Sequence, residues 1–165
     1  MAALNTGVQA PPFTLPTVDG TEFELEAALK RGPVVLAFFK VGCPVCQYAF
    51  PFVERLFRAH HGAKATVVGV SQDNLRDTKA FLREYNISFP VALDDTSRYP
   101  VSNAYGLTNV PTLFYIAPDG EIEISSVGWS KSDMETIHQR LAEHRGEEAG
   151  PLWRKGEEVQ DFRAG

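Results

Sequence analysis

The stretch Phe38-Phe-Lys-Val-Gly-Cys43-Pro-Val-Cys46-Gln-Tyr-Ala-Phe-Pro51 decides the fold of this 165-residue chain. Its two cysteines are the only ones in the sequence, and they lie three positions apart. Such a Cys-x-x-Cys pair is typical of a redox dithiol or of half a zinc site; the alternative is two buried thiols without chemistry. An apolar run at 34–39 predicts a buried strand before the pair, and apolar residues at helical spacing from Val45 to about His60 predict a helix after it.

The expected place of the pair, at the start of a helix, assigns different roles to its two thiols. At or near the N-cap, free backbone N–H groups and the helix dipole favour the thiolate of Cys43. Pro44 suits the first helical position, where its missing N–H costs nothing. Cys46 follows one turn further in, within reach of Cys43. We therefore expect Cys43 to attack a disulfide and Cys46 to resolve the intermediate.

The rest of the chain alternates strand and helix patterns. The segment 13–25 has apolar residues at alternate positions around Asp19-Gly20, which predicts a hairpin. Asp73 or Asn74 can cap a helix, and Ser130 with Asp133 predicts the start of the last helix. This order predicts an α/β fold with helices on both faces of a sheet. The other expected elements are a strand at 66–70, an extended piece at 89–93, a helical turn or two within 97–105, and a hairpin of 113–116 with 121–124.

The cysteine segment resembles the active site of the thioredoxin superfamily, including the helix proline Pro51 five residues after the second cysteine. The segment Asn109-Val-Pro111-Thr-Leu-Phe-Tyr-Ile-Ala-Pro-Asp-Gly120 is similar to the family's cis-proline strand. The resemblance implies that the Val110–Pro111 bond is cis and that Pro111 lies against the dithiol. It also implies that the Val110 backbone pairs with a substrate chain. The alternative is that Pro111 is an ordinary proline at the start of a strand.

The leading hairpin and the long segment 71–108 resemble the TlpA/ResA-like and AhpC/TSA (redoxin) branch, over roughly residues 7–145. This implies a thioredoxin-like fold: a central mixed β-sheet flanked by helices, an N-terminal β-hairpin extension and an inserted segment before the cis-proline strand. We expect one domain over 1–145 and a charged tail over 146–165. The tail is either flexible or docks its large aromatic residues, Trp153 and Phe162, on the domain.

Several positions depart from the family pattern or have two interpretations. Gly42 replaces the usual tryptophan before the first cysteine, so a more open dithiol is expected. Ala37 replaces the buried acid of plain thioredoxins. Asp73 falls where ResA-like proteins carry an acidic residue, so it either relays the proton of Cys46 or merely caps the following helix. Lys40 either favours the Cys43 thiolate by its charge or is a solvated surface lysine.

Three functions are compatible with these motifs, and a thiol–disulfide oxidoreductase acting on protein partners is favoured. A peroxiredoxin-like peroxidase would need a hydroxyl residue where Lys40 stands and a proline where Leu36 stands. A metal-binding CxxC chaperone would need further ligands, but His60 and His61 lie about four helical turns away, roughly 22 Å. Cys43, Cys46, Pro111 and Asp73 are thus the candidate catalytic residues, with Val110 and Pro44 contacting substrate.

Composition narrows the partners. The net charge of −5 argues against nucleic acid and anionic membranes as partners. There is no apolar run long enough for a membrane span and no basic leader, so we expect a cytoplasmic protein. No organic cofactor or metal is expected. Electrons are expected to come from or go to another dithiol protein.

Overall fold

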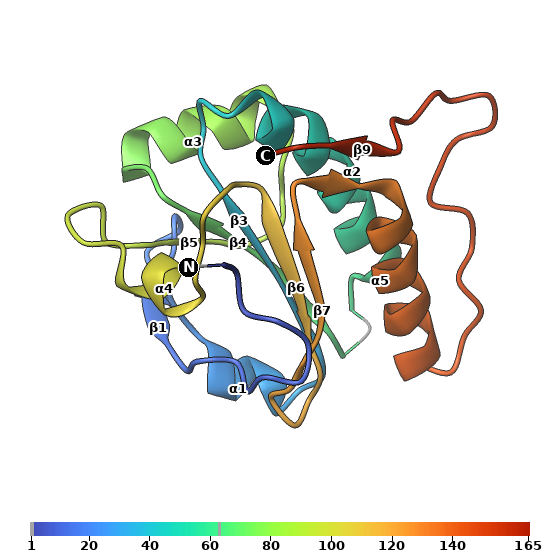
Figure 1. Ribbon diagram of the computed structural model, residues 1–165, viewed down its shortest axis with the longest axis horizontal. Coiled ribbons are helices and arrows are strands. Elements are labelled where there is room, and N and C mark those ends of the chain that lie inside the picture. Colours follow the sequence, from blue (N-terminus) through green and yellow to red (C-terminus); the bar gives the residue numbers. More distant parts are fainter. Residues whose placement is uncertain (1, 63) are drawn as a thin grey trace.

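The centre of the molecule is a five-stranded mixed sheet in the order β5-β4-β3-β6-β7 (Figure 1). The structure is a computed structural model that describes residues 2–62 and 64–165. β3 runs parallel to β4 and antiparallel to β6. This is the thioredoxin-like arrangement expected from the sequence. The strands are β3 (Val34–Phe39), β4 (Thr66–Ser71), β5 (Val91–Leu93), β6 (Thr112–Ile116) and β7 (Ile122–Val127).

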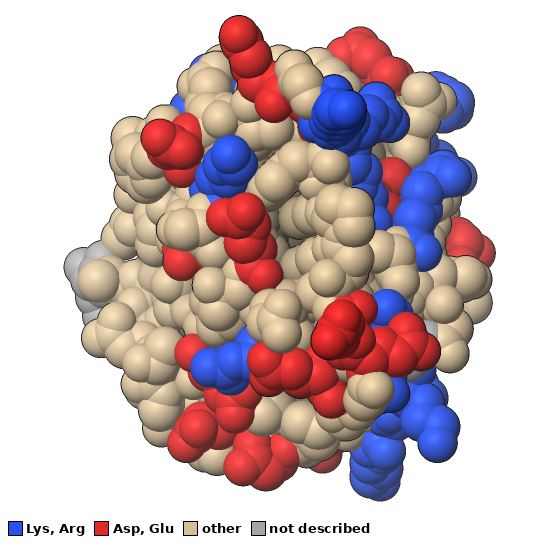
Figure 2. All heavy atoms as spheres, turned by 90° about the vertical axis from the view of Figure 1, so that its right-hand side faces the viewer, with Lys and Arg blue, Asp and Glu red and all other residues tan. Residues whose placement is uncertain are grey.

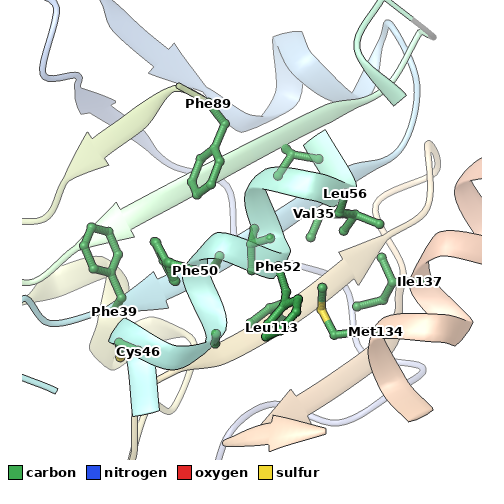
Figure 3. Packing of buried hydrophobic residues seen from close by; sticks show 14 of the residues in the cluster. Val35, Phe39, Cys46, Phe50, Phe52, Leu56, Phe89, Leu113, Met134 and Ile137 are labelled. Atoms are coloured by element: carbon green, nitrogen blue, oxygen red, sulfur yellow. The ribbon is translucent and has the colours of Figure 1, made fainter. Parts of the chain in front are cut away.

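The central strand β3 is buried on both sides because alternate side chains enter two separate cores. Val35, Ala37 and Phe39 belong to one core, to which α2, α3 and α5 contribute. Figure 3 shows Val35 and Phe39 among side chains of α2 and α5. The opposite core receives side chains from α1, α4 and the N-terminal hairpin. The helices are α1 (Leu25–Leu29), α2 (Pro44–His60), α3 (Leu75–Glu84), α4 (Pro100–Ala104) and α5 (Lys131–His144), and the hairpin is β1 (Thr14–Pro16) with β2 (Glu22–Glu24).

The expected helix caps are confirmed in part. The side chain of Ser130 accepts a hydrogen bond from the N–H of Asp133 at the start of α5, 3.2 Å. At α3 the capping residue is Asn74, whose side chain accepts the N–H of Asp77 at 2.8 Å. Asp73 is therefore not the cap of this helix. Its carboxylate makes no bond to the N–H groups of this helix and contacts another segment, described below.

The C-terminal tail packs on the domain, so the flexible alternative is wrong. Leu152 is buried, and the Trp153 ring lies 5.4 Å from that of Phe52 in α2. The tail then returns toward α2 (Figure 1), and β9 (Phe162–Arg163) pairs antiparallel with β8 (Trp129–Ser130). The docking expected for Phe162 is absent, since its side chain stays 61% exposed.

Acidic and basic side chains occur together on the face that carries the tail (Figure 2). They share this face with many uncharged residues rather than forming a block of one sign. Among the residues that the structure describes, no helix is both long and apolar enough to cross a membrane.

Candidate active site

Three segments meet at one end of the sheet because of the strand directions. β3 and β4 are parallel, so the loops that follow them emerge at the same edge. β6 is antiparallel to β3 with Thr112 opposite Phe38, so the residues just before β6 lie at that edge too. This brings together Cys43, Asp73 and Pro111, which the sequence places far apart.

Cys43 is the N-cap residue of α2, as the sequence predicts. Its sulfur accepts a hydrogen bond from the backbone N–H of Cys46, with an N–Sγ distance of 3.1 Å. This bond places a backbone N–H donor of the first helical turn against the sulfur. Pro44 occupies the first turn and is exposed. The half-buried Cys43 is therefore the member of the pair that another molecule can reach.

Cys46 faces inward from the first turn of α2 and has no exposed surface. It lies in the same core as Phe39 and Phe50 (Figure 3). Burial, together with the neighbouring Cys43, raises the pKa of the Cys46 thiol far above its usual range. Cys46 is thus held protonated until its surroundings change.

The bond between Val110 and Pro111 is cis, as predicted. Pro111 is buried and Val110 half-buried. The thiol of Cys43 donates to the carbonyl oxygen of Val110, with a distance of 3.4 Å. A hollow of about 340 Å³ opens at this point. Its walls come from Lys40, Cys43, Gln72, Leu107, Thr108, Asn109, Val110 and Gly165.

Asp73 binds the loop that leads into the cysteine pair. Its carboxylate accepts the backbone N–H of Val41 at 2.8 Å, and the amide of Gln47 donates to the carbonyl of Val41 at 2.9 Å. Val41 is thus held at both of its backbone polar groups. Sequence reasoning missed Val41 and Gln47; the place of Gln47 one residue after Cys46, on the first turns of the helix, was the available signal.

The positions that depart from the family pattern differ in their exposure to solvent. Lys40 and Gly42 are exposed, whereas Ala37 and Leu36 are buried in β3. Because Gly42 has no side chain, it does not cover the sulfur of the following Cys43 from solvent. Within residues 2–62 and 64–165, no group of three or more His, Cys, Asp or Glu side chains could hold a metal ion.

This geometry agrees with comparisons to known proteins. The model of the AhpC/TSA family matches residues 6–125. The chain belongs to the AhpC/TSA family. The match spans the hairpin, the dithiol and the cis-proline strand, which are the features that the sequence resemblance rests on.

Similar members of known function are thiol–disulfide oxidoreductases. The chain is 31% identical over 122 residues to thiol-disulfide oxidoreductase ResA of Bacillus subtilis, covering 73% of this chain and 66% of that protein. It is 25% identical over 140 residues to ResA of Bacillus cereus, covering 84% and 79%. A thiol:disulfide interchange protein of Chlorobium tepidum matches with a TM-score of 0.69 and 26% identity, over 88% of this chain and 100% of that one. With its Cys43–Cys46 pair, this AhpC/TSA protein is a thiol–disulfide oxidoreductase of the ResA/DsbE type.

Proposed function

We propose that the reduced protein attacks disulfides of polypeptide partners through Cys43 and that Cys46 completes the exchange. The observation that carries this proposal is the unequal exposure of the two sulfurs. Cys43 is half-buried at the helix start, whereas Cys46 is fully buried one turn later. This difference in accessibility supports Cys43 as the first attacking sulfur and Cys46 as the second.

In the first step the Cys43 thiolate attacks one sulfur of the substrate disulfide. A bond forms between the Cys43 sulfur and that atom, the substrate S–S bond breaks, and the other substrate sulfur leaves as a thiolate that takes up a proton. Cys46 then loses its proton and attacks the Cys43 sulfur, which releases the second substrate thiol. The two protein thiols are oxidised to one disulfide, and the substrate disulfide is reduced to two thiols.

The second step requires a base, because the Cys46 thiol is buried and protonated. We assign to Asp73 the role of relaying this proton. Its negative charge is one of the influences that raise the pKa of Cys46, after burial and Cys43. Its hydrogen bond to Val41 places it beside the loop that precedes the pair. In this role Asp73 acts on Cys46, and we assign to Pro111, which directly follows the carbonyl group that Cys43 contacts, a place against the dithiol.

The substrate class follows from the backbone beside Cys43. Val110 is half-buried next to the half-buried Cys43 and the exposed Pro44, so an extended polypeptide could pair with its backbone and contact Pro44. The oxidised protein must then be reduced by another dithiol partner, since the reaction consumes both of its thiols. The cytoplasmic location expected from the sequence stays a prediction, and fractionation of the source cells with an antibody against the chain tests it.

Trapping tests the order of attack. The Cys46→Ser variant, mixed with a peptide disulfide, should accumulate a mixed disulfide at Cys43, visible as one added peptide mass. The Cys43→Ser variant should accumulate none, because Cys46 is buried. A mixed disulfide on Cys46 in that variant would contradict the proposed roles.

Peroxide is the second candidate substrate, because the chain belongs to the AhpC/TSA family and the sulfur of Cys43 is accessible. The exposed lysine at position 40 offers no hydroxyl group to orient a peroxide, so we expect slow oxidation. Timed alkylation of the reduced protein after addition of hydrogen peroxide measures it. A rate close to that of free cysteine supports disulfide exchange, and one faster by orders of magnitude would make peroxide the substrate.

A further inference from the structure

Residues 160–165 run along β8 toward the active-site end of the molecule, held by hydrogen bonds of their backbone. The indole N–H of Trp129 donates to the carbonyl of Gln160 at 2.7 Å, and the N–H of Lys131 donates to that of Asp161 at 2.9 Å. β9 then continues this pairing along β8. The segment is therefore laid down as an added strand beside β8.

Gly128 makes this close passage possible. A β-carbon on Gly128 would lie 2.6 Å from the carbonyl oxygen of Arg163, so no other residue leaves room for the strand here. Gly128 also has a φ of 78°, which glycine adopts without strain. The backbone of the tail at Arg163 therefore packs directly against the backbone of the domain at Gly128.

The segment ends at the carbonyl group to which Cys43 donates. The side-chain amide of Asn109 donates to the carbonyl of Gly165 at 3.1 Å. A β-carbon on Gly165 would lie 2.5 Å from the carbonyl oxygen of Val110. The thiol of Cys43 binds that same oxygen from its own side. Gly165 and Cys43 therefore flank the carbonyl group of Val110, and Gly165 forms part of the wall of the hollow.

The attachment of the tail is strong upstream and weak at its end. Upstream, Leu152 is buried, and Arg55 makes two hydrogen bonds to the carboxylate of Glu157, at 2.7 and 2.6 Å. Near the end, the pairing of β8 with β9 involves two residues on each strand, and Phe162 is 61% exposed. Arg163 also lies over the Tyr48 ring, at 5.1 Å. A molecule that displaces only residues 162–165 can therefore leave the buried anchor at Leu152 and Glu157 in place.

We propose that residues 162–165 determine substrate selection by occupying the Val110 side of the substrate groove. This inference rests on the proposed function, in which a polypeptide substrate pairs with Val110. Such a substrate must displace the four residues, whereas a small disulfide reaches Cys43 through the open hollow beside Lys40. The tail therefore disfavours extended polypeptides relative to small disulfides and restricts reaction to chains that bind tightly enough to take its place.

The test compares the full chain with a variant that lacks residues 162–165. Single-turnover loss of thiols in the reduced protein is followed by alkylation and mass, once with insulin and once with a nitrobenzoate disulfide. The variant should react with insulin about tenfold faster, the factor expected when one or two hydrogen bonds no longer have to be displaced. Its rate with the small disulfide should change less than about twofold. Phe162→Ala, which removes an exposed side chain and keeps the backbone, should behave like the full chain.

The outcomes separate this inference from the proposed function. Equal insulin rates, an equal gain with both substrates, or a slower insulin reaction of the shortened chain would overturn the role of the tail. Inactivity of both forms toward insulin would instead overturn the polypeptide substrate itself, and the tail proposal with it.

Amide hydrogen exchange gives a second test that needs no truncation. In the Cys46→Ser variant, a cysteine-containing peptide coupled to Cys43 should speed exchange of the amides of residues 162–165, and a coupled small thiol should not. Unchanged protection with the peptide would overturn the proposal.

Discussion

The carboxylate of Asp73 and the backbone N–H of Val41 are joined by a hydrogen bond of 2.8 Å, across 32 residues of sequence. This bond connects the loop that follows β4 to the loop that leads into Cys43. Asp73 therefore has two separable properties, an acceptor for Val41 and a negative charge near Cys46. A substitution that keeps the first and removes the second distinguishes them.

Asp73→Asn retains an oxygen that can accept the Val41 N–H but carries no charge and binds no proton. If Asp73 relays the proton of Cys46, closure of the Cys43–Cys46 disulfide from a mixed disulfide should slow by about 100-fold at neutral pH. Stopped-flow kinetics of closure across pH measures this. Asn74→Ala is the matched control, since it removes the neighbouring helix cap and should reduce stability while closure stays normal. A wild-type pH profile in Asp73→Asn would remove the relay and leave Asp73 a positioning residue.

Gln47→Ala removes the donor to the carbonyl of Val41, which is part-buried. We expect the free energy of unfolding to fall by about 1 kcal/mol, as for a typical lost hydrogen bond. Denaturant unfolding measures this change. Gln139→Ala on the exposed face of α5 is the comparison, with an expected loss below about 0.5 kcal/mol. Equal losses for both variants would show that the bond to Val41 contributes nothing specific.

Glu54 is a buried carboxylate of α2 that accepts the backbone N–H of Ser88 at 2.8 Å and that of Phe89 at 3.3 Å. Glu54→Ala leaves these donors without their partner, so the free energy of unfolding should fall by about 2–3 kcal/mol. The ion-pair partner Arg58 is largely exposed, and Arg58→Ala should cost less than about 1 kcal/mol. Chemical denaturation of both variants measures the two losses of unfolding free energy. A larger loss in Arg58→Ala than in Glu54→Ala would contradict this prediction.

Two histidines connect α2, α5 and the tail in one chain of hydrogen bonds. The guanidinium of Arg145, always a donor, lies 2.9 Å from Nδ1 of His60, so the proton of this ring is on Nε2. Nε2 of His60 then donates to Nδ1 of His138 at 2.8 Å, and Nε2 of His138 donates to the carbonyl of Gly150 at 2.7 Å. The ring of His60 fits this chain only in its neutral form.

Burial, followed by the charges of His138 and Arg145, lowers the pKa of His60 from 6.5 to about 4. Between these values the unfolded chain binds a proton at His60 and the folded chain does not. The contribution of His60 to stability is therefore fully present above about pH 6.5 and is lost as the pH falls toward about 4. Unfolding free energies measured over this range should show a decline that His60→Gln reduces. His61→Gln, at the exposed neighbouring position, should leave the decline unchanged, and an equal effect of both would contradict the assignment.

The sequence predicted the parts of the site that depend on local patterns. Cys43 and Cys46 lie at a helix start because an apolar strand, a proline and a helical repeat follow one another within 27 residues, 34–60. The cis bond before Pro111 followed from a resemblance carried by a contiguous segment. Contacts between distant segments could not be found this way, because no local pattern marks them.

The tail shows this limit most clearly. Its charged composition resembles that of a flexible end, yet Glu157 bonds to Arg55 across 102 residues. Glu157 is only partly exposed to solvent, and the hydrogen bonds from Arg55 lower its pKa to about 2. Nothing in the local sequence distinguishes this glutamate from the solvated ones around it. The short helix α1 and the two-residue strands β8 and β9 were missed for a related reason, since they are too short to show a period.

The place of Gly165 beside the Val110 carbonyl has a practical consequence for handling this protein. Whatever polypeptide follows residue 165, whether an affinity tag, a fluorescent reporter or a fusion partner, begins at the rim of the hollow that holds Cys43. Such an addition would crowd the reactive sulfur and distort any assay of it. A tag or a sensor-surface attachment should therefore not be placed directly after residue 165.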